Sequence, residues 1–241
     1  MGSLSRNQLQ QLKSYSTYVD ESVTTIFSLQ QLHNDEFLSD FLTLIKAISK
    51  VESDVIALSY FTRRYGMFIS MQFYMLTMYD EVWDGSLSNL KFGIKEEFGN
   101  TSLCTFTNSS DWHWVEEENR ESAFKKILEQ QCYEIFVQLR KITSVSPKML
   151  WENVFGYMLW HYHVLLSNPG TCEQAQLDIA LLENDSIWLP FARHSYFKEY
   201  TGGEHPSKLI NIPVRKTCCF SKDIPGWMQC GFCPLKYNNE Q

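Results

Sequence analysis

The sequence lacks the features that mark several common classes of protein. Its 28 Asp and Glu residues outnumber its 21 Lys and Arg residues, and the resulting net charge of −7 argues against a nucleic-acid-binding protein. The sequence shows no internal repeat, low-complexity linker, glycine-rich phosphate loop or nucleotide fingerprint. The most apolar run, YGMFISMQFYMLTMY at residues 65–79, is too short and too polar for a transmembrane segment and is typical of a buried helix.

Secretion and disulfide bonding are not indicated either. The first residues, MGSLSRNQLQQLK, carry no apolar run behind their charges, so we expect no signal peptide and a cytoplasmic protein. Because cytoplasmic thiols stay reduced, the seven cysteines, an odd number, do not indicate a disulfide framework. The chain does contain many apolar residues. Hydrophobic residues make up 44% and aromatic residues 15% of its 241 residues, which is enough for a sizeable core.

Apolar residues recur at helical spacing along most of the chain. Asn34 and Asp35 suit the start of a helix, and Pro147 after Ser146 suits the first position of another. The segments that we expect to be helical are a loose pattern over residues 4–32, a helix after Asn34, a long helix from Ser53 and Asp54 to about Tyr79, a helix that follows EEENRE and runs to about Ile142, a helix from Pro147 to about Leu166, and a shorter helix at 172–183.

The hydrophobic period changes in the middle of the chain, where strands are predicted. LKFGI (90–94) and SLCTFT (102–107) flank a turn-prone Gly-Asn pair. WHWV (112–115) is predicted to be a third strand. These segments indicate a small antiparallel sheet.

The chain becomes irregular and rich in Gly and Pro beyond Pro190. A loop of that length usually is held by a cross-link or a bound metal, or has a function. We therefore predict a mainly helical α+β protein. Its body spans residues 1–210, with the small antiparallel sheet near 88–116, and an irregular C-terminal segment at 211–241 packs on it.

Four of the seven cysteines lie close together in that segment. TCCFSKDIPGWMQCGFCPL contains the adjacent pair Cys218 and Cys219 and the spaced pair Cys230 and Cys233, and the Pro-Gly between the pairs favours a chain reversal. Thiolates are soft ligands, so four together select zinc, copper(I) or an iron–sulfur cluster.

The adjacent pair of cysteines helps to distinguish between zinc and an iron–sulfur cluster as the group that the segment would bind. Neighbouring side chains tend to diverge, which makes it awkward to close both thiols on one small ion such as zinc. A two-iron cluster is longer and offers ligand positions on separate irons. A structural zinc site, a vicinal disulfide and unrelated thiols remain alternatives on these residues alone.

One stretch resembles a known family. RKTCCFSKDIPGWMQCGFCPL (215–235) is similar to the C-terminal signature of the FhuF-like ferric siderophore reductases, in which basic residues precede Cys-Cys, ten residues follow, and Cys-x-x-Cys-Pro ends the motif. A weaker resemblance is LWEN (150–153), which is similar to a Trp-x-Asn element upstream in that family. The stronger match covers about 21 residues, from Arg215 to Leu235.

The resemblance implies a 2Fe–2S cluster bound by Cys218, Cys219, Cys230 and Cys233. The cluster would pass one electron to Fe(III) in a siderophore held by the body of the protein, and Fe(II) would be released in the cytoplasm. Because the chain shows no flavin or nicotinamide fingerprint, we expect a separate electron donor, such as a ferredoxin or a flavin reductase.

A ferric siderophore is bulky and often anionic, so we expect cations and aromatic residues around it. The candidate contacts are Arg63, Arg64, Arg193, His194, Lys208 and Arg215. For Arg63 and Arg64 the alternative is an exposed helix edge or an internal ion pair. His161 and His163 are two residues apart on a predicted helix and point in different directions, so we expect them to pack rather than bind metal.

Two other functions remain possible readings of the same residues. The chain could be an iron–sulfur sensor or electron carrier without a siderophore substrate. It could also be a helical interaction domain whose C-terminal segment is stapled by zinc.

Overall fold

The computed structural model describes residues 4–97 and 99–235 and has the predicted mainly helical α+β architecture. Its α-helices are α1 (Arg6–Ser14), α2 (Asp35–Ser49), α3 (Asp54–Tyr79), α4 (Arg120–Lys126), α5 (Glu134–Ile142), α6 (Pro147–Ser167), α7 (Cys172–Glu183), α8 (Tyr196–Thr201) and α9 (Pro206–Leu209). A π-helical stretch, Ile127–Tyr133, joins α4 to α5. The 3₁₀ turns are Leu29–His33, Ser109–Asp111, Glu117–Asn119, Asp185–Trp188 and Ser221–Asp223.

The strands form one mixed sheet and one separate ribbon. They are β1 (Thr17–Val19), β2 (Phe27–Ser28), β3 (Glu81–Trp83), β4 (Lys91–Glu97), β5 (Asn100–Thr107) and β6 (Trp112–Trp114). The sheet has the order β1-β5-β4-β2, in which β1 runs parallel to β5 and the other neighbours are antiparallel. The ribbon pairs β3 with β6.

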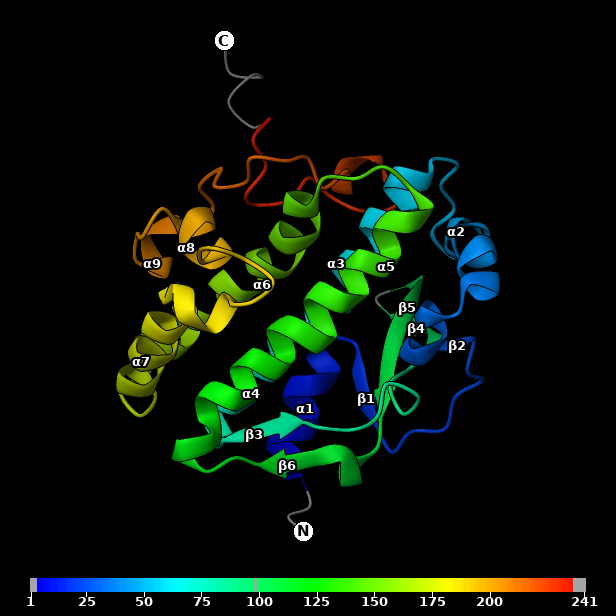
Figure 1. Cartoon of the computed structure of the whole chain (residues 1–241). Helices are drawn as coiled ribbons and strands as arrows, with labels where there is room; N and C mark the ends of the chain where they lie inside the picture. Colours follow the sequence, from blue (N-terminus) through cyan, green and yellow to red (C-terminus); the bar gives the residue numbers. More distant parts are fainter. Residues whose placement is uncertain (1–3, 98, 236–241) are drawn as a thin grey trace.

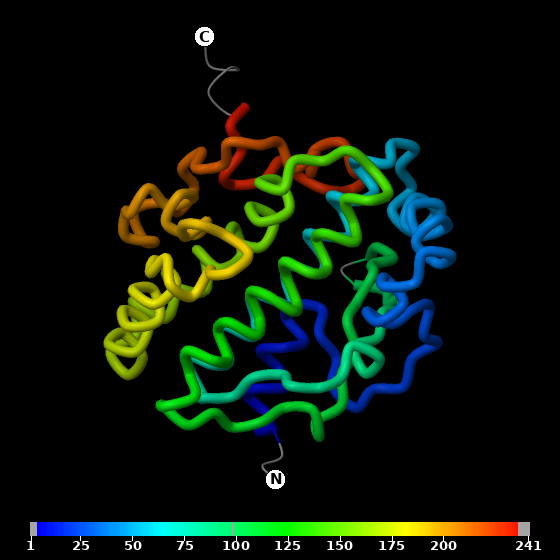
Figure 2. The backbone as a smooth tube through the Cα atoms, viewed as in Figure 1, coloured from blue at the N-terminus to red at the C-terminus, as the bar shows by residue number. Residues whose placement is uncertain are grey.

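The helices α3 and α6 form the centre of the molecule. They pack against each other more extensively than any other two elements, and the remaining helices and the sheet surround them (Figures 1 and 2). Gly66 permits this close approach, because a Cβ atom there would lie only 2.9 Å from the backbone oxygen of Asn153. The predicted long helix is thus buried on most faces, as its uniformly apolar composition indicates.

Most of the helices predicted from the sequence are confirmed. The helices at residues 54–79 and 172–183 have the predicted bounds, and the helix that begins at Pro147 ends at Ser167. Asn34 caps α2 as expected, because its side chain accepts hydrogen bonds from the backbone N–H groups of Glu36 and Phe37.

Two local predictions are wrong in part. The helix in the first 32 residues ends at Ser14, and the following residues supply β1 and β2, because they pair with the two strands of the β4–β5 hairpin. WHWV does contain a strand, but it pairs with β3 and not with the hairpin. In both cases the partner strand is remote in sequence, and local propensity cannot identify it.

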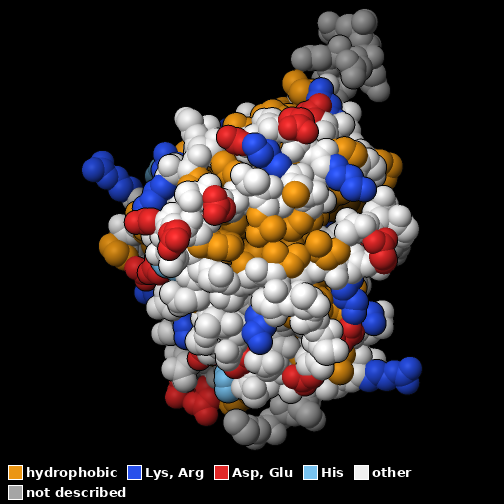
Figure 3. Space-filling model, turned by 90° about the vertical axis from the view of Figure 1, so that its right-hand side faces the viewer, with side chains coloured by type: hydrophobic (Ala, Val, Ile, Leu, Met, Phe, Trp, Pro, Cys, Tyr) orange, Lys and Arg blue, Asp and Glu red, His pale blue; other side chains and the backbone are white. Residues whose placement is uncertain are grey.

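Hydrophobic side chains gather on the face that carries α2 and the β4–β5 hairpin. This is the right-hand side of Figure 1, and Figure 3 shows the apolar patch in its middle with charged side chains around it. More than half of a folded protein's surface comes from apolar atoms, so this patch alone identifies no partner.

Candidate functional site

The four clustered cysteines lie where the C-terminal segment crosses the N-terminal halves of α3 and α6 (Figure 1). Cys219 and Cys233 are buried, Cys218 and Cys230 are half-buried, and all four are free thiols. The predicted segment 211–241 extends past the described residues at positions 236–241.

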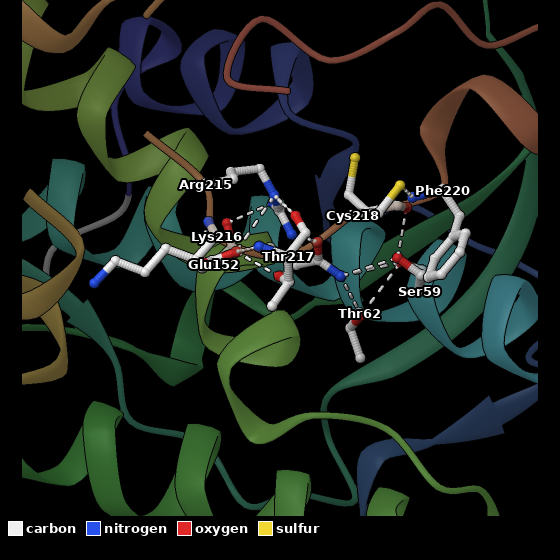
Figure 4. Close-up of polar contacts among 10 residues, drawn as sticks. Ser59, Thr62, Glu152, Arg215, Lys216, Thr217, Cys218 and Phe220 are labelled. Carbon is white, nitrogen blue, oxygen red and sulfur yellow. Dashed lines mark hydrogen bonds and ion pairs between the residues drawn. The ribbon is translucent and has the colours of Figure 1, made fainter. Parts of the chain in front are cut away.

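A buried carboxylate holds the backbone just before the cysteines. Glu152 on α6 accepts hydrogen bonds from the backbone N–H groups of Lys216 at 2.9 Å and Thr217 at 3.0 Å (Figure 4). It also accepts a hydrogen bond from the hydroxyl of Thr217. Because an ionised carboxylate is a strong acceptor, these bonds fix the backbone that immediately precedes Cys218.

Arg215, which belongs to the same segment, attaches it to α6 through its own side chain. Its guanidinium donates to the backbone oxygens of Glu152 at 2.8 Å and Thr217 at 3.2 Å, and to Oδ1 of Asn153 at 2.8 Å. Its Nε lies 3.7 Å from the Glu152 carboxylate, and both side chains are almost fully buried. The hydrogen-bonding capacity of Arg215 is thus largely used by the protein itself.

Asn153 extends the network to α3 and to the cysteines (Figure 4). Its amide nitrogen donates to Oγ of Ser59 at 3.2 Å and to Oγ1 of Thr62 at 2.8 Å. Ser59 in turn donates to the backbone oxygen of Cys219 at 2.7 Å. The two stretches that carry the family resemblance, 150–153 and 215–235, are therefore in direct contact.

The thiols interact with one another and with nearby donors. A hydrogen bond from Cys230 lowers the pKa of Cys219, and the positive charges of Arg63 and Arg215 act in the same direction against the effect of burial. The same hydrogen bond raises the pKa of Cys230. Of this pair, Cys219 is therefore the thiol that ionises more readily, and the thiolate is the form that binds metal.

Two further hydrogen bonds reach the remaining thiols. The backbone N–H of Phe220 donates to Sγ of Cys218 at 3.3 Å, and Nε2 of Gln229 donates to Sγ of Cys233 at 3.0 Å. Among residues 4–97 and 99–235, no three His, Cys, Asp or Glu side chains are grouped so that they could hold one metal ion.

Arg63 faces the cysteines from α3. Its guanidinium lies between two rings, 5.6 Å from the centre of Tyr157 and 5.3 Å from that of Trp227, and its charge stabilises the thiolate of Cys219. In the described part of the chain, no carboxylate lies within ion-pair distance of Arg63, and its buried Nε has no hydrogen-bond partner. Arg63, Arg215 and Cys230 share a cavity of about 100 Å³.

The structure places the other predicted cations away from the thiols or in other contacts. Arg64 forms the internal ion pair that was its alternative role, 2.8 Å from Glu97. Arg193 is exposed, and Lys208 pairs with Glu204 at 3.3 Å on the surface. His194 lies 3.2 Å from Glu199.

His161 and His163 differ in their surroundings. His161 is buried between the rings of Tyr15 and Tyr74, at 4.4 and 5.2 Å, and burial lowers its pKa to about 3. His163 lies beside Trp160, with 6.3 Å between the ring centres.

Sequence reasoning assigned no role to several residues that build the site. These are Ser59, Thr62, Glu152, Asn153, Tyr157 and Trp227. A usable signal was present, because Glu152 and Asn153 are consecutive polar residues in a mainly apolar helix. Buried polar side chains in such a position normally have hydrogen-bond partners elsewhere in the fold.

No protein-family model matches the chain, and no curated protein matches it either.

Proposed function

We propose that this chain is a ferric siderophore reductase whose Cys218, Cys219, Cys230 and Cys233 hold a 2Fe–2S cluster. The observation that carries the proposal is the hydrogen-bonded contact between the thiols of Cys219 and Cys230, one from each half of the sequence Cys-Cys-x₁₀-Cys-x₂-Cys, beside the guanidinium groups of Arg63 and Arg215. The direct contact between the two stretches that resemble the family supports the same function.

The chemistry of the donor set fits such a cluster. Thiolates are its usual ligands, and the thiol of Cys219 already ionises readily. The N–H donors of Phe220 and Gln229 contact two of the four sulfurs, and hydrogen bonds to sulfur tune the reduction potential of a cluster. The two guanidinium charges would offset the negative charge of four thiolates.

The chemistry supplied by a bound cluster is the transfer of one electron at a time to the chelated Fe(III). Siderophores hold Fe(III) through hard oxygen donors, and reduction to Fe(II) weakens that preference, so iron leaves the chelator. The residues of this chain would bind the anionic chelate close to the thiols, where Arg63 supplies a positive charge that no carboxylate in the described region neutralises.

A separate protein would supply the electrons, such as a ferredoxin or a flavin reductase, and the reaction would take place in the cytoplasm. Within residues 4–97 and 99–235, no helix has the length and apolar character needed to cross a membrane.

Spectroscopy on anaerobically purified protein tests the proposal. We expect two irons and two acid-labile sulfides per chain, with an EPR signal that appears only after reduction. Cys218→Ser and Cys233→Ser should each remove or destabilise the cluster, whereas Cys172→Ser, which alters a cysteine outside the segment, should leave it intact. A colourless protein with one zinc would show that the segment is a structural staple.

A second measurement tests the reaction. Chemically reduced, cluster-loaded protein is mixed with ferric chelates in the presence of a chromogenic Fe(II) chelator, which reports release of iron. We expect Fe(II) to form in an amount that matches the electrons held by the protein. If the reduced protein leaves hydroxamate, catecholate and hydroxycarboxylate chelates all oxidised, the chain is a carrier or sensor and not a reductase.

A further inference from the structure

An apolar recess lies on the other side of Glu152 from the cysteine segment. It is a cavity of about 270 Å³ between the start of α6, helix α8 and Lys216. Trp151, Phe155, Tyr196 and Tyr200 form its walls, and we call it the aryl pocket.

The walls of the aryl pocket are held in place by contacts with one another. The ring of Trp151 lies 5.6 Å from those of both Phe155 and Tyr196, and Phe155 lies 5.5 Å from Tyr200. The hydroxyl of Tyr200 is buried and has no hydrogen-bond partner among the described residues. Aromatic walls of this kind favour a flat ring, which can stack or meet them edge to face.

Two lysines stand at the mouth of the pocket and share one carboxylate. Glu199 lies 2.5 Å from Nζ of Lys148 and 3.7 Å from Nζ of Lys216. The carboxylate of Glu152, which also lines the pocket, lies 3.7 Å from Nε of the buried Arg215, and that guanidinium offsets its charge. The mouth therefore carries an excess of positive charge in a protein whose net charge is −7.

The aryl pocket and the cysteine site share a wall. Glu152 lines the pocket and also holds the backbone that leads into Cys218. Figure 4 shows the Lys216 side chain extending away from Cys218, on the opposite side of this network. A ligand seated in the pocket would thus lie against the same short segment that carries the thiols.

We propose that the aryl pocket binds one catecholate ring of an anionic siderophore, with Lys148 and Lys216 beside its oxygens. The inference rests on the proposed function and adds the substrate class. A cavity of about 270 Å³ holds a single substituted ring and not a whole chelate, because sites for drug-sized ligands occupy roughly 300–1,000 Å³. The remaining arms and the metal stay outside the pocket.

Calorimetric titration of the full chain with gallium(III) chelates tests this inference, because Ga(III) replaces Fe(III) without being reduced. The probes are gallium complexes of 2,3-dihydroxybenzoate, which is aromatic and anionic, of citrate, which is anionic without a ring, and of acetohydroxamate, which has neither a ring nor a net charge. We expect saturable binding of the first complex, and binding of the other two that is at least about tenfold weaker.

Variants locate the binding. Lys148→Ala and Lys216→Ala should each weaken binding of the catecholate complex about two- to fivefold, as expected for charges at the edge of a site, and added salt should reduce the difference. Lys208→Ala removes an exposed lysine outside the pocket and is the matched control. Tyr196→Leu should weaken binding further, whereas Trp114→Leu, at an exposed tryptophan on the β3–β6 ribbon, should not.

The outcomes separate this inference from the proposed function. If the chain carries a 2Fe–2S cluster but binds the three complexes equally, or loses as much affinity in Lys208→Ala as in Lys216→Ala, the inference is wrong and the function stands. If the catecholate complex binds as expected to a chain that carries no cluster, the pocket assignment stands and the reductase function is wrong.

Discussion

The hydroxyl of Ser59 donates a hydrogen bond of 2.7 Å to the backbone oxygen of Cys219, although the two residues are 160 positions apart. Ser59 is fully buried in α3, and its hydroxyl also accepts a hydrogen bond from Asn153. One side chain therefore joins the two central helices to the adjacent pair of cysteines. The C-terminal segment, irregular by itself, takes its position from these helices.

Removal of this hydroxyl should loosen the cysteine segment. Ser59→Ala leaves the oxygen of Cys219 and the amide of Asn153 each short of a buried partner, which costs about 1–3 kcal/mol. We expect faster alkylation of Cys218 and Cys219 in the metal-free protein, measured by mass spectrometry. Ser70→Ala is the control, because Ser70 is also buried in α3 but bonds only within its own helix, to Met67. Equal alkylation rates in both variants would contradict the proposed anchoring.

Neutralising Glu152 should have a larger effect. Glu152→Gln removes the negative charge beside the buried guanidinium of Arg215 and weakens the bonds to the backbone of Lys216 and Thr217. Loss of one partner of a buried pair is strongly destabilising, so we expect the free energy of unfolding to fall by about 3 kcal/mol in urea titrations.

The matched control is Glu204→Gln, which breaks an exposed pair with Lys208 and should change the free energy of unfolding by only about 0–1 kcal/mol. Similar losses in the two variants would mean that Glu152 does not hold the segment.

Arg63 should raise the reduction potential of the proposed cluster. A positive charge next to the thiolate of Cys219 favours the more negative, reduced state, so Arg63→Gln should lower the potential by tens of millivolts. A shift of 59 mV corresponds to a tenfold change in a one-electron equilibrium. Spectroelectrochemical titration of the loaded protein measures the potential.

Lys222→Gln is the control for Arg63. It removes an exposed positive charge from the same segment and should shift the potential much less, because solvent screens the lysine. An unchanged or higher potential in Arg63→Gln would show that the arginine does not act on the cluster electrostatically.

His161 should make the protein less stable as the pH falls. Burial lowers its pKa in the folded state to about 3, whereas the unfolded chain binds the proton near pH 6.5. The contribution of His161 to the free energy of unfolding is therefore fully present above about pH 6.5 and decreases as the pH falls toward 3. Between pH 6.5 and 5 the free energy of unfolding should fall by about 2 kcal/mol. Denaturant titrations across this range should give a smaller loss for His161→Phe. Identical pH dependence in both proteins would rule out this role for His161.

The main helices follow from local sequence signals, and the site does so only in part. Pro147 and the Asn34 cap place helix starts, and the apolar run after Asp54 continues until Asp80 ends α3 in the left-handed conformation. The four cysteines are visible by their spacing alone. The polar pair Glu152 and Asn153 indicated buried hydrogen-bond partners, but the partners themselves were not predictable, because Ser59 and Glu152 bond to chain segments that are remote in sequence.

The sequence by itself determined the mainly helical fold, the long buried helix and the presence of four clustered thiols, because periodicity, helix caps and residue spacing are local properties. Only the tertiary structure decided which cations face those thiols. Arg63 and Arg64 are neighbours, but successive side chains on a helix point about 100° apart. Packing of α3 against α6 directs Arg63 toward Cys219 and Arg64 toward Glu97, so one is left without a carboxylate and the other is neutralised.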